Sequence, residues 1–303
     1  MADTTSTLPT LFILLGPTGV GKTELSIALA RRLNSPVISA DSRQVFRELP
    51  IGSAMPPADC LSAVRHYFIA TRSVTEKYSA GQYEADVLHL TDTLFLTHDS
   101  LLMVGGSMMY IDAVCRGFDD VPAIDESVRR SVQDDMHHYG LDYLLDELRR
   151  VDEEHYQRVD RQNYRRVMRA IEVCRQTHQP YSSFRRGHTA ERPFRIVKIG
   201  LNRPRPELYQ RINQRVDVML RDGLIDEARQ LTHLRHLPAL NTVGYKELFA
   251  YMEGKNSLEE AIWQIKNNTH HYAKRQLTWF KRDGDYLFLT PNQLNDTILA
   301  QFL

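Results

Sequence analysis

The sequence has little cysteine, no long apolar run and no net charge. Cys60, Cys115 and Cys174 are the only cysteines among 303 residues, and they lie far apart. An odd, widely spaced set excludes a disulfide framework and lacks the ligand spacing of structural zinc, so we expect reduced thiols in a cytoplasmic protein. No apolar run is long enough to span a membrane. Residues 1–10 are polar, without the basic region and apolar segment of a signal peptide.

Positive charge is concentrated in one part of the chain, although the whole is neutral, with 38 Lys and Arg and 38 Asp and Glu. Residues 158–215 contain fifteen Lys and Arg against four acids, which gives this segment a net charge of +11 and the remainder −11. Such asymmetry indicates an anionic macromolecular partner. A solvated helix face rich in arginine is the other interpretation of the same count.

A phosphate-binding loop follows the apolar run at residues 11–15. Its glycines let successive N–H groups point at one spot, and the dipole of the following helix, residues 24–33, adds positive potential there. The lysine adds a full charge, and the final hydroxyl can hold Mg²⁺. The sequence therefore predicts a polyphosphate site, in a loop type that kinases, ATPases and other transferases share. The loop consists of Gly16, Pro17, Thr18, Gly19, Val20, Gly21, Lys22 and Thr23.

Alternating apolar and helical patterns predict an α/β fold, a parallel sheet flanked by helices of the phosphate-loop type. The predicted strands are residues 11–15, 37–40, 101–104, 196–201 and 286–289. Helical patterns separate most of them, as at residues 83–96, and continue at 207–221, 225–234, 246–253 and 258–281. His66 and Tyr67 suit the start of a further strand.

Residues 119–187 show helical patterns only, at 126–138, 143–151 and 164–177. We therefore expect an all-helical insertion domain at 119–187, within a catalytic core formed by residues 1–118 and 188–303. In the insertion, Arg158, Arg161, Arg165 and Arg169 line one side of a helical pattern and Val167, Ile171 and Cys174 another. A basic front of this kind can follow a nucleic-acid backbone, or it can be an ordinary amphipathic surface. Twelve scattered histidines give no metal-ligand spacing.

Polar residues follow two further strands at the edge where ligands of parallel sheets bind. Asp41 comes directly after residues 37–40, where a carboxylate can accept a proton or help hold Mg²⁺; a helix N-cap is the alternative. Gly105, Gly106 and Ser107 follow residues 101–104 and form either a ligand-binding turn or a structural one. Arg211 and Arg215, four residues apart, share one helix face and suit a diphosphate.

Taken together, these motifs resemble those of the bacterial tRNA dimethylallyltransferase family, the tRNA isopentenyltransferases, over nearly the whole chain. The matching segments are GPTGVGKT at 16–23, ISADSRQVFRELPIGSAMP at 38–56, YSAGQYEADV at 78–87, VGGSMMYIDAV at 104–114, NYRRVMRAIEV at 163–173, RINQRVDVMLRDGLIDE at 211–227, TVGYKEL at 242–248 and AKRQLTWFKR at 273–282.

The resemblance implies transfer of a dimethylallyl group from dimethylallyl diphosphate to N6 of adenosine 37 of tRNA, with release of diphosphate. It implies that the phosphate loop, Thr18 and Arg215 bind the diphosphate and that Asp41 is the general base. Mg²⁺ is the implied cofactor, held by Thr23, with Asp41 as a second candidate ligand.

The implied partner is the anticodon stem-loop of tRNA, bound by a monomeric cytoplasmic enzyme without a membrane partner. The RNA contacts that the resemblance implies are Asp41, Ser42, Arg43, Gln44, Ser107, Arg129, Arg165, Arg166, Val167, Met168, Arg169, Asn241, Thr242, Val243, Gly244, Tyr245 and Lys246.

Three other functions use some of the same features. An adenylate isopentenyltransferase would act on free AMP, ADP or ATP, but it needs no basic helical platform. A small-molecule phosphotransferase using ATP would need the phosphate loop alone. An RNA-binding protein without catalysis would not need Asp41 and Arg215 together.

Overall fold

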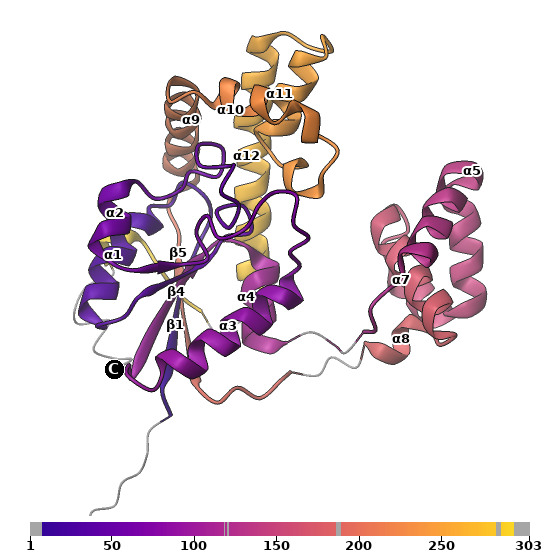
Figure 1. Ribbon diagram of the computed structural model, residues 1–303, viewed down its shortest axis with the longest axis horizontal. Coiled ribbons are helices and arrows are strands. Elements are labelled where there is room, and N and C mark those ends of the chain that lie inside the picture. The colour runs from indigo at the N-terminus through magenta and orange to yellow at the C-terminus, as the bar shows by residue number, and fades with distance from the viewer. Residues whose placement is uncertain (1–7, 118, 120, 186–188, 283–285, 294–303) are drawn as a thin grey trace, which may run out of the picture. The chain divides into compact units, whose positions relative to one another are not determined.

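A parallel six-stranded sheet forms the centre of the larger of two compact units in this computed structural model (Figure 1). The structure describes residues 8–117, 119, 121–185, 189–282 and 286–293, and the polar start at residues 1–7 lies outside them. Every strand pair is parallel, which confirms the predicted α/β class. The strand order is β3 (His66–Tyr67), β2 (Val37–Ala40), β4 (Ser100–Gly105), β1 (Thr10–Leu15), β5 (Arg195–Leu201) and β6 (Leu287–Leu289).

The sheet is apolar on both faces, as expected for parallel strands covered by helices. In β1, Phe12 and Leu14 pack in one cluster with α1 (Lys22–Arg32). Leu11, Ile13 and Leu15 pack in the opposite cluster with α3 (Ala80–Leu94) and α4 (Met108–Arg116). The short α2 (Ala58–Ala63) buries none of its residues.

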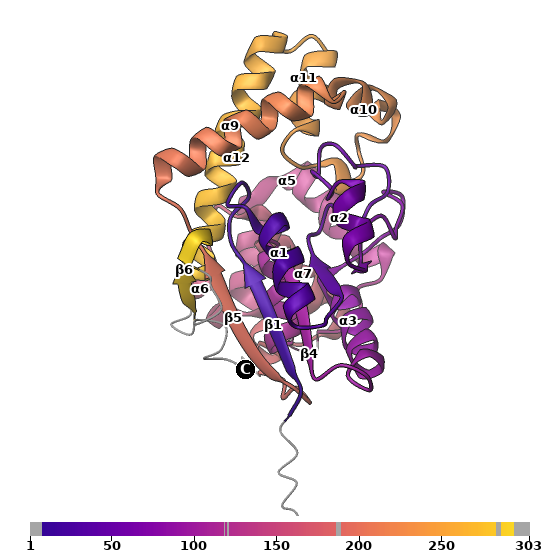
Figure 2. The same cartoon turned by 90° about the vertical axis from the view of Figure 1, so that its left-hand side faces the viewer.

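Four helices cover the region beyond the carboxyl ends of β1 and β5 (Figures 1 and 2). Their buried side chains form a third cluster around Val216, Leu224, Tyr245 and Ile265. This cluster covers the edge of the sheet where the phosphate loop lies. The helices are α9 (Arg205–Arg221), α10 (Leu224–Gln230), α11 (Tyr245–Met252) and α12 (Leu258–Phe280), with 3₁₀ turns at Thr232–Leu234, Pro238–Leu240 and Pro291–Gln293.

The second compact unit, Arg116–Glu191, contains helices and no strand in its described part. Val132 and Leu148 of α5 pack against Val167 and Ile171 of α7 in its core. The insertion expected at 119–187 falls inside this unit, and the expected boundaries at 118 and 187–188 lie outside the described residues. Its helices are α5 (Glu126–Val151), α6 (Glu153–Arg158), α7 (Tyr164–Thr177) and α8 (Tyr181–Phe184).

The break expected between the helices at 126–138 and 143–151 is present: Glu126–Val151 kinks at Gly140, whose backbone is non-helical with φ 81° and ψ −176°. Most other helix ends lie within three residues of the expected positions. The helix expected at 225–234 ends at Gln230 and continues as a 3₁₀ turn. None of the helices in the described ranges combines the length and apolarity that crossing a membrane requires.

Candidate active site

The phosphate loop faces a cavity of about 580 Å³ in the larger unit. Loops after β1 and β2 supply one part of its lining, and α9 and α12 supply the other. The sequence therefore correctly places Asp41 and the phosphate loop at one edge of the sheet. The predicted residues that line the cavity are Thr18, Gly19, Gly21, Lys22, Thr23, Asp41, Ser42, Arg43, Gln44, Arg211, Arg215, Thr242, Val243 and Gly244.

Backbone strain explains the glycine at the end of the loop. Gly21 has φ 103°, in the left-handed region that other residues rarely adopt, and it immediately precedes the first residue of α1. Val20 is fully buried and anchors the loop to the core. From outside, Arg203 donates to the Val20 carbonyl at 2.8 Å and Arg211 to the Gly19 carbonyl at 2.9 Å. Both arginines thus fix the loop through its carbonyl groups.

Lys22 carries the positive charge of the loop in a desolvated position. Its Nζ donates to the carbonyls of Gly16 at 2.8 Å and Pro17 at 2.9 Å. Burial, reinforced by the nearby Arg215 and opposed by Asp41, lowers the pKa of Lys22 to about 8. A buried ammonium with so low a pKa gains strongly from a bound anion.

Asp41 caps a turn, not a helix, because the residues that follow it form turns and the next helix begins at Ala58. Its Oδ1 accepts hydrogen bonds from the backbone N–H groups of Arg43 at 2.9 Å and Gln44 at 3.3 Å. The helix N-cap interpretation is therefore wrong. The turn leaves the carboxylate on the cavity lining.

Ser107 links the second glycine turn to the Asp41 turn. Its Oγ accepts from the Ser42 N–H at 2.8 Å and donates to Ser42 Oγ at 3.1 Å. Its own N–H donates to the Ala40 carbonyl at 3.1 Å. Ser107 is 7% exposed, so its side chain connects the two turns and offers little surface for contact with RNA.

Arg215 lies on the stripe of α9 that faces the cavity. Residues Ile212, Arg215, Val216 and Met219 follow helical spacing, and all four line the cavity. The guanidinium donates to the Ser53 carbonyl at 3.5 Å. Burial lowers the pKa of Arg215 and Asp41 opposes this effect, but a guanidinium stays protonated. A cation flanked by apolar side chains suits a phosphate that carries a short hydrocarbon.

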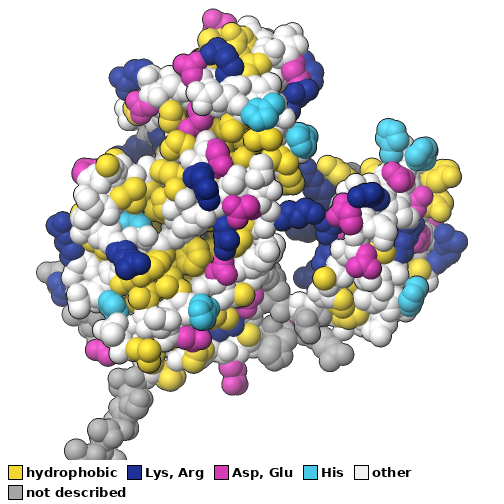
Figure 3. Space-filling model, viewed as in Figure 1, with side chains coloured by type: hydrophobic (Ala, Val, Ile, Leu, Met, Phe, Trp, Pro, Cys, Tyr) yellow, Lys and Arg dark blue, Asp and Glu magenta, His cyan; other side chains and the backbone are white. Residues whose placement is uncertain are grey.

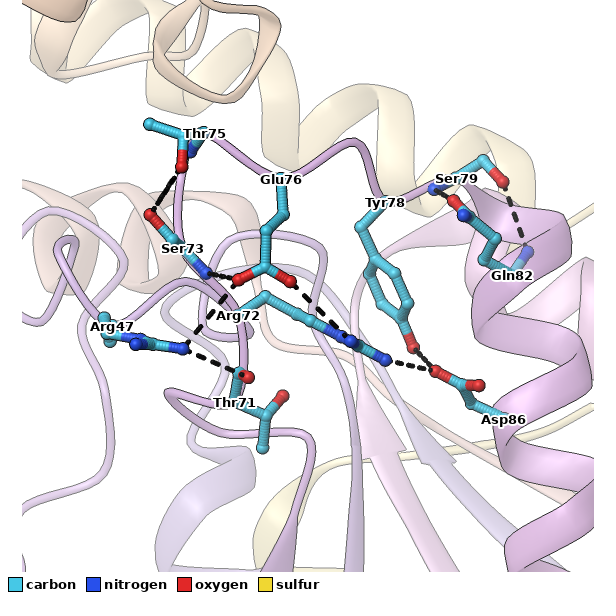
Figure 4. Close-up of polar contacts among 10 residues, drawn as sticks. All are labelled: Arg47, Thr71, Arg72, Ser73, Thr75, Glu76, Tyr78, Ser79, Gln82 and Asp86. Atoms are coloured by element: carbon cyan, nitrogen blue, oxygen red, sulfur yellow. Dashed lines mark hydrogen bonds and ion pairs between the residues drawn. The ribbon is translucent and has the colours of Figure 1, made fainter.

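A polar network holds the segment after Asp41 against α3 (Figure 4). Arg72 pairs with Asp86 at 2.9 Å, and the Tyr78 hydroxyl donates to the same carboxylate at 2.8 Å. Arg72 also exchanges backbone hydrogen bonds with the 45–47 segment, at 2.9 Å each. The network thus ties the strand-like segment beside Gln44 to a helix of the core.

The family profile of IPP transferases matches residues 44–283 of this chain. The chain belongs to the IPP transferase family. Among curated relatives, tRNA dimethylallyltransferase 1 of Phocaeicola vulgatus is 51% identical over 294 residues, covering 97% of each chain. tRNA dimethylallyltransferase 1 of Bacteroides thetaiotaomicron is 48% identical and covers 98% of this chain and 96% of its own.

Solved structures of IPP transferases share the fold. The tRNA isopentenylpyrophosphate transferase of Bacillus halodurans matches with a TM-score of 0.69 at 35% identity, covering 97% of this chain and 94% of that one. A eukaryotic dimethylallyltransferase that acts on tRNA matches with a TM-score of 0.82 at 25% identity, covering 96% and 77%. Both matches extend over more than nine-tenths of this chain.

Several residues that the resemblance to IPP transferases assigns to RNA are placed elsewhere by the structure. Tyr245 is fully buried, and its hydroxyl donates to Glu227 at 2.5 Å, so its side chain is part of the core. Val167 is also fully buried, in the core of the helical unit. Both are corrections, since a completely enclosed side chain cannot contact RNA. Asn241 and Lys246 are exposed.

In the helical unit, exposure and pairing divide the basic residues into two groups. Arg165 and Arg166 of α7 are exposed, and among the described residues neither has an acidic partner within 4 Å. Arg129 and Arg169 pair with acids of their own helices at 3.8 Å and 3.5 Å. Arg175 is used internally, in ion pairs with Asp135 and Glu147 at 2.7 and 2.5 Å.

The visible face of this unit is mixed in charge, and Figure 3 shows its Lys and Arg interspersed with Asp, Glu and His. On this face, therefore, the positive charges do not form a uniformly basic surface.

Sequence reasoning missed the cavity residues supplied by the long helix α12 and the acid of α10. Tyr272 lines the cavity, and burial together with Asp41 raises its pKa to about 12. Gln276 contacts two loops. Glu227 of α10 accepts the N–H groups of Ile51 and Gly52, both at 2.8 Å. A single sequence predicts these helices but not which loops they meet.

The candidate metal ligands are oxygen groups beside the phosphate loop. Across the described residues, His, Cys, Asp and Glu form no group of three or more that could hold a metal ion. Thr23 and Asp41 both line the cavity and offer oxygen. This donor set fits Mg²⁺, which is usually held by one or two protein oxygens together with phosphates and water.

Proposed function

We propose that this chain transfers a dimethylallyl group from dimethylallyl diphosphate to N6 of adenosine 37 of tRNA and releases diphosphate. One observation carries the proposal: Lys22 and Arg215 share a cavity with the carboxylate of Asp41. The relatives that are about half identical over nearly the whole chain are named tRNA dimethylallyltransferases, which supports the choice of reaction.

The donor side stabilises the leaving group. As the allylic C–O bond lengthens, negative charge grows on the departing diphosphate oxygen. Lys22, Arg215 and the loop N–H groups lie where they stabilise that charge more in the transition state than in the ground state. Thr23 would hold Mg²⁺, which supplies further charge neutralisation when bound, and the Asp41 carboxylate is left to act as the base. The apolar neighbours of Arg215 on α9, Ile212 and Val216, suit the hydrocarbon end.

The acceptor side must activate a weak nucleophile. The lone pair of the adenine amino group is delocalised into the ring, so N6 needs a base to accept its proton while the N–C bond forms. Asp41 is assigned this role because the turn orients its carboxylate toward the cavity. The target adenine must leave its stack to enter, at a cost of a few kcal/mol.

The helical unit is assigned to the anticodon stem-loop. Arg165 and Arg166 are exposed on α7 and suit phosphate contacts. The chain is assigned to act as a monomer, and tRNA as its substrate fits the cytoplasm.

Acceptor choice tests the proposal against its nearest alternative. Purified protein, Mg²⁺ and radiolabelled dimethylallyl diphosphate would be incubated with unmodified tRNA in one tube and with AMP, ADP and ATP in another. We expect label in tRNA, at the adenosine beside the anticodon. Label in free nucleotides only would assign the chain to adenylate isopentenyltransferases, and label in neither would favour a phosphotransferase using ATP.

A further inference from the structure

Gln276 of α12 makes two hydrogen bonds, one part-buried and one buried, to loops that are distant in sequence. Its Oε1 accepts from the backbone N–H of Thr18 at 3.0 Å, and its Nε2 donates to the carbonyl of Gly106 at 2.7 Å. The side chain is 2% exposed. One amide thus joins the phosphate loop, after β1, to the glycine turn after β4.

The backbone of α12 is fixed on both sides of this glutamine. Ala273, one turn earlier, packs in the cluster on the α1 face of the sheet. Phe280, one turn later, packs in the cluster on the opposite face. Because both neighbours are buried in the core, the amide of Gln276 is held at a set position relative to the sheet.

Gly106 approaches Gln276 too closely for any side chain. A Cβ added at Gly106 would lie 2.4 Å from Gln276 Nε2 and 3.2 Å from the carbonyl oxygen of Gly16. The glycine turn, the phosphate loop and α12 therefore meet at this point. The packing requires a glycine here if the glutamine is to reach both loops.

From Gly106 the contacts continue to the acceptor side. The next residue, Ser107, holds the Ser42 N–H at 2.8 Å, and Ser42 follows Asp41 directly. A continuous path of covalent and hydrogen bonds therefore runs from Thr18 through Gln276, Gly106, Ser107 and Ser42 to Asp41. Its ends are the donor-binding loop and the assigned base.

We propose that Gln276 is a positioning residue that sets the distance between the diphosphate-binding loop and Asp41. The inference rests on the proposed function, because it concerns the alignment of that donor with that base. Both ends of its amide are bound by protein groups, Thr18 and Gly106, and it acts through them. Misalignment of reacting groups by about 1 Å costs on the order of 100-fold in rate, so loss of the link acts on turnover more than on binding.

The first test compares Gln276→Met with Gln264→Met. Methionine matches glutamine in length but makes neither hydrogen bond. Gln264 is a matched control, since it lies on the same helix and its amide meets Asn256 at 3.5 Å, away from the cavity. We expect Q276M to lower kcat by on the order of 100-fold with little change in KM for dimethylallyl diphosphate or tRNA. We expect Q264M to resemble the wild type. A wild-type kcat for Q276M, or equal losses in both variants, would overturn the inference.

A double-mutant cycle asks whether Gly106 acts through the same contact. Gly106→Ala places a Cβ against the Gln276 amide and is expected to lower kcat in the wild-type background. In the Gln276→Ala background that amide is absent, so Gly106→Ala is expected to lower kcat only slightly. Additive losses would contradict a shared contact.

A readout without catalysis separates this inference from the proposed function. Inorganic diphosphate with Mg²⁺ would be added to each protein, and amide hydrogen exchange of residues 105–109 followed. Slower exchange in the wild type and Q264M, but not in Q276M, supports the link even if no transfer to tRNA is found. Equal slowing in all three proteins, or none in the wild type, would overturn it.

Discussion

Asp41 combines two functions in one carboxylate. One oxygen, Oδ1, accepts hydrogen bonds from the N–H groups of Arg43 and Gln44 and so fixes the turn. The residue also lines the cavity beside Lys22 and Arg215. An asparagine can retain the first function, because its carbonyl oxygen still accepts hydrogen bonds, but it cannot take up a proton.

Replacement of Asp41 by Asn is therefore the sharpest test of the general base. We expect Asp41→Asn to lower kcat by roughly 10² to 10⁴-fold, the usual contribution of a positioned acid or base, with tRNA affinity little changed. Single-turnover transfer and tRNA binding would be measured on the same preparation. Turnover that remains at the wild-type level would end this assignment.

Lys22 predicts a pH dependence for donor binding. Its pKa is lowered to about 8 by burial, and a bound diphosphate raises it again. Below pH 8 the ammonium is already charged. Above pH 8, binding requires proton uptake, so we expect affinity for dimethylallyl diphosphate to fall by up to about tenfold per pH unit. The donor phosphates themselves are ionised well below this range.

Titration calorimetry between pH 7 and 9.5, in buffers of different ionisation enthalpy, would detect the proton uptake by Lys22. Lys22→Arg is the control, since a guanidinium keeps its charge throughout this range. A wild-type profile as flat as that of K22R would contradict the assignment.

At the scale of elements, the joint between β2 and β4 limits residue size. A Cβ at Gly105 would lie 2.1 Å from the carbonyl oxygen of Ala40, which is backbone and cannot rotate away. We expect Gly105→Ala to cost about 1–3 kcal/mol of folding free energy, the range of overpacked cores. Urea unfolding measures this cost.

Gly81 supplies the control for that substitution. It is exposed in α3, and a Cβ there would find only Ser79 Oγ, at 3.9 Å. Gly81→Ala is expected to stabilise the protein by about 0.5–1 kcal/mol, because alanine is favoured over glycine in a helix. Equal urea midpoints for the two variants would show that the β2–β4 joint is not tightly packed.

Helix α7 carries the arginines expected to meet RNA. Neutralising Arg165 and Arg166 together should weaken tRNA binding and reduce the salt dependence of log K by roughly one unit per lost phosphate contact. Arg149 and Arg150 of α5 form a control pair with the same change in charge. Arg149 pairs with Glu153 at 3.5 Å, and Arg150 donates to the Asp146 carbonyl at 3.3 Å. An equal effect of both double variants would move the RNA surface away from α7.

The elements that the sequence predicts best are those with a strong local signal. The buried strands, the phosphate loop and the amphipathic α7 follow from residue type and spacing alone. The break between the helical patterns at 126–138 and 143–151 also follows from the sequence, and the chain kinks between them at Gly140.

At the scale of the whole molecule, the site depends on contacts between parts of the chain that are far apart in sequence. Thr18 and Gln276 are 258 residues apart, and no local pattern relates them. Arg175 shows the same limit, because its ion-pair partners Asp135 and Glu147 lie 40 and 28 residues earlier in the chain, on α5. Strand and helix position made Asp41 and Arg215 candidates and the family resemblance implied their roles, whereas the supporting contacts required the fold.

The two compact units divide the proposed work. The sheet unit contains the cavity with the phosphate loop and Asp41, and the helical unit, Arg116–Glu191, contains the exposed arginines of α7. In the proposed reaction, diphosphate is released only when the dimethylallyl group is transferred to tRNA. No nucleotide is hydrolysed.

The most direct test of this coupling measures diphosphate release and label incorporation into tRNA in the same reaction. Dimethylallyl diphosphate, Mg²⁺ and unmodified tRNA would be supplied without ATP. The account predicts one diphosphate released for each dimethylallyl group found on the adenosine beside the anticodon, and no release without tRNA. Diphosphate release that does not depend on tRNA, or a requirement for ATP, would contradict it.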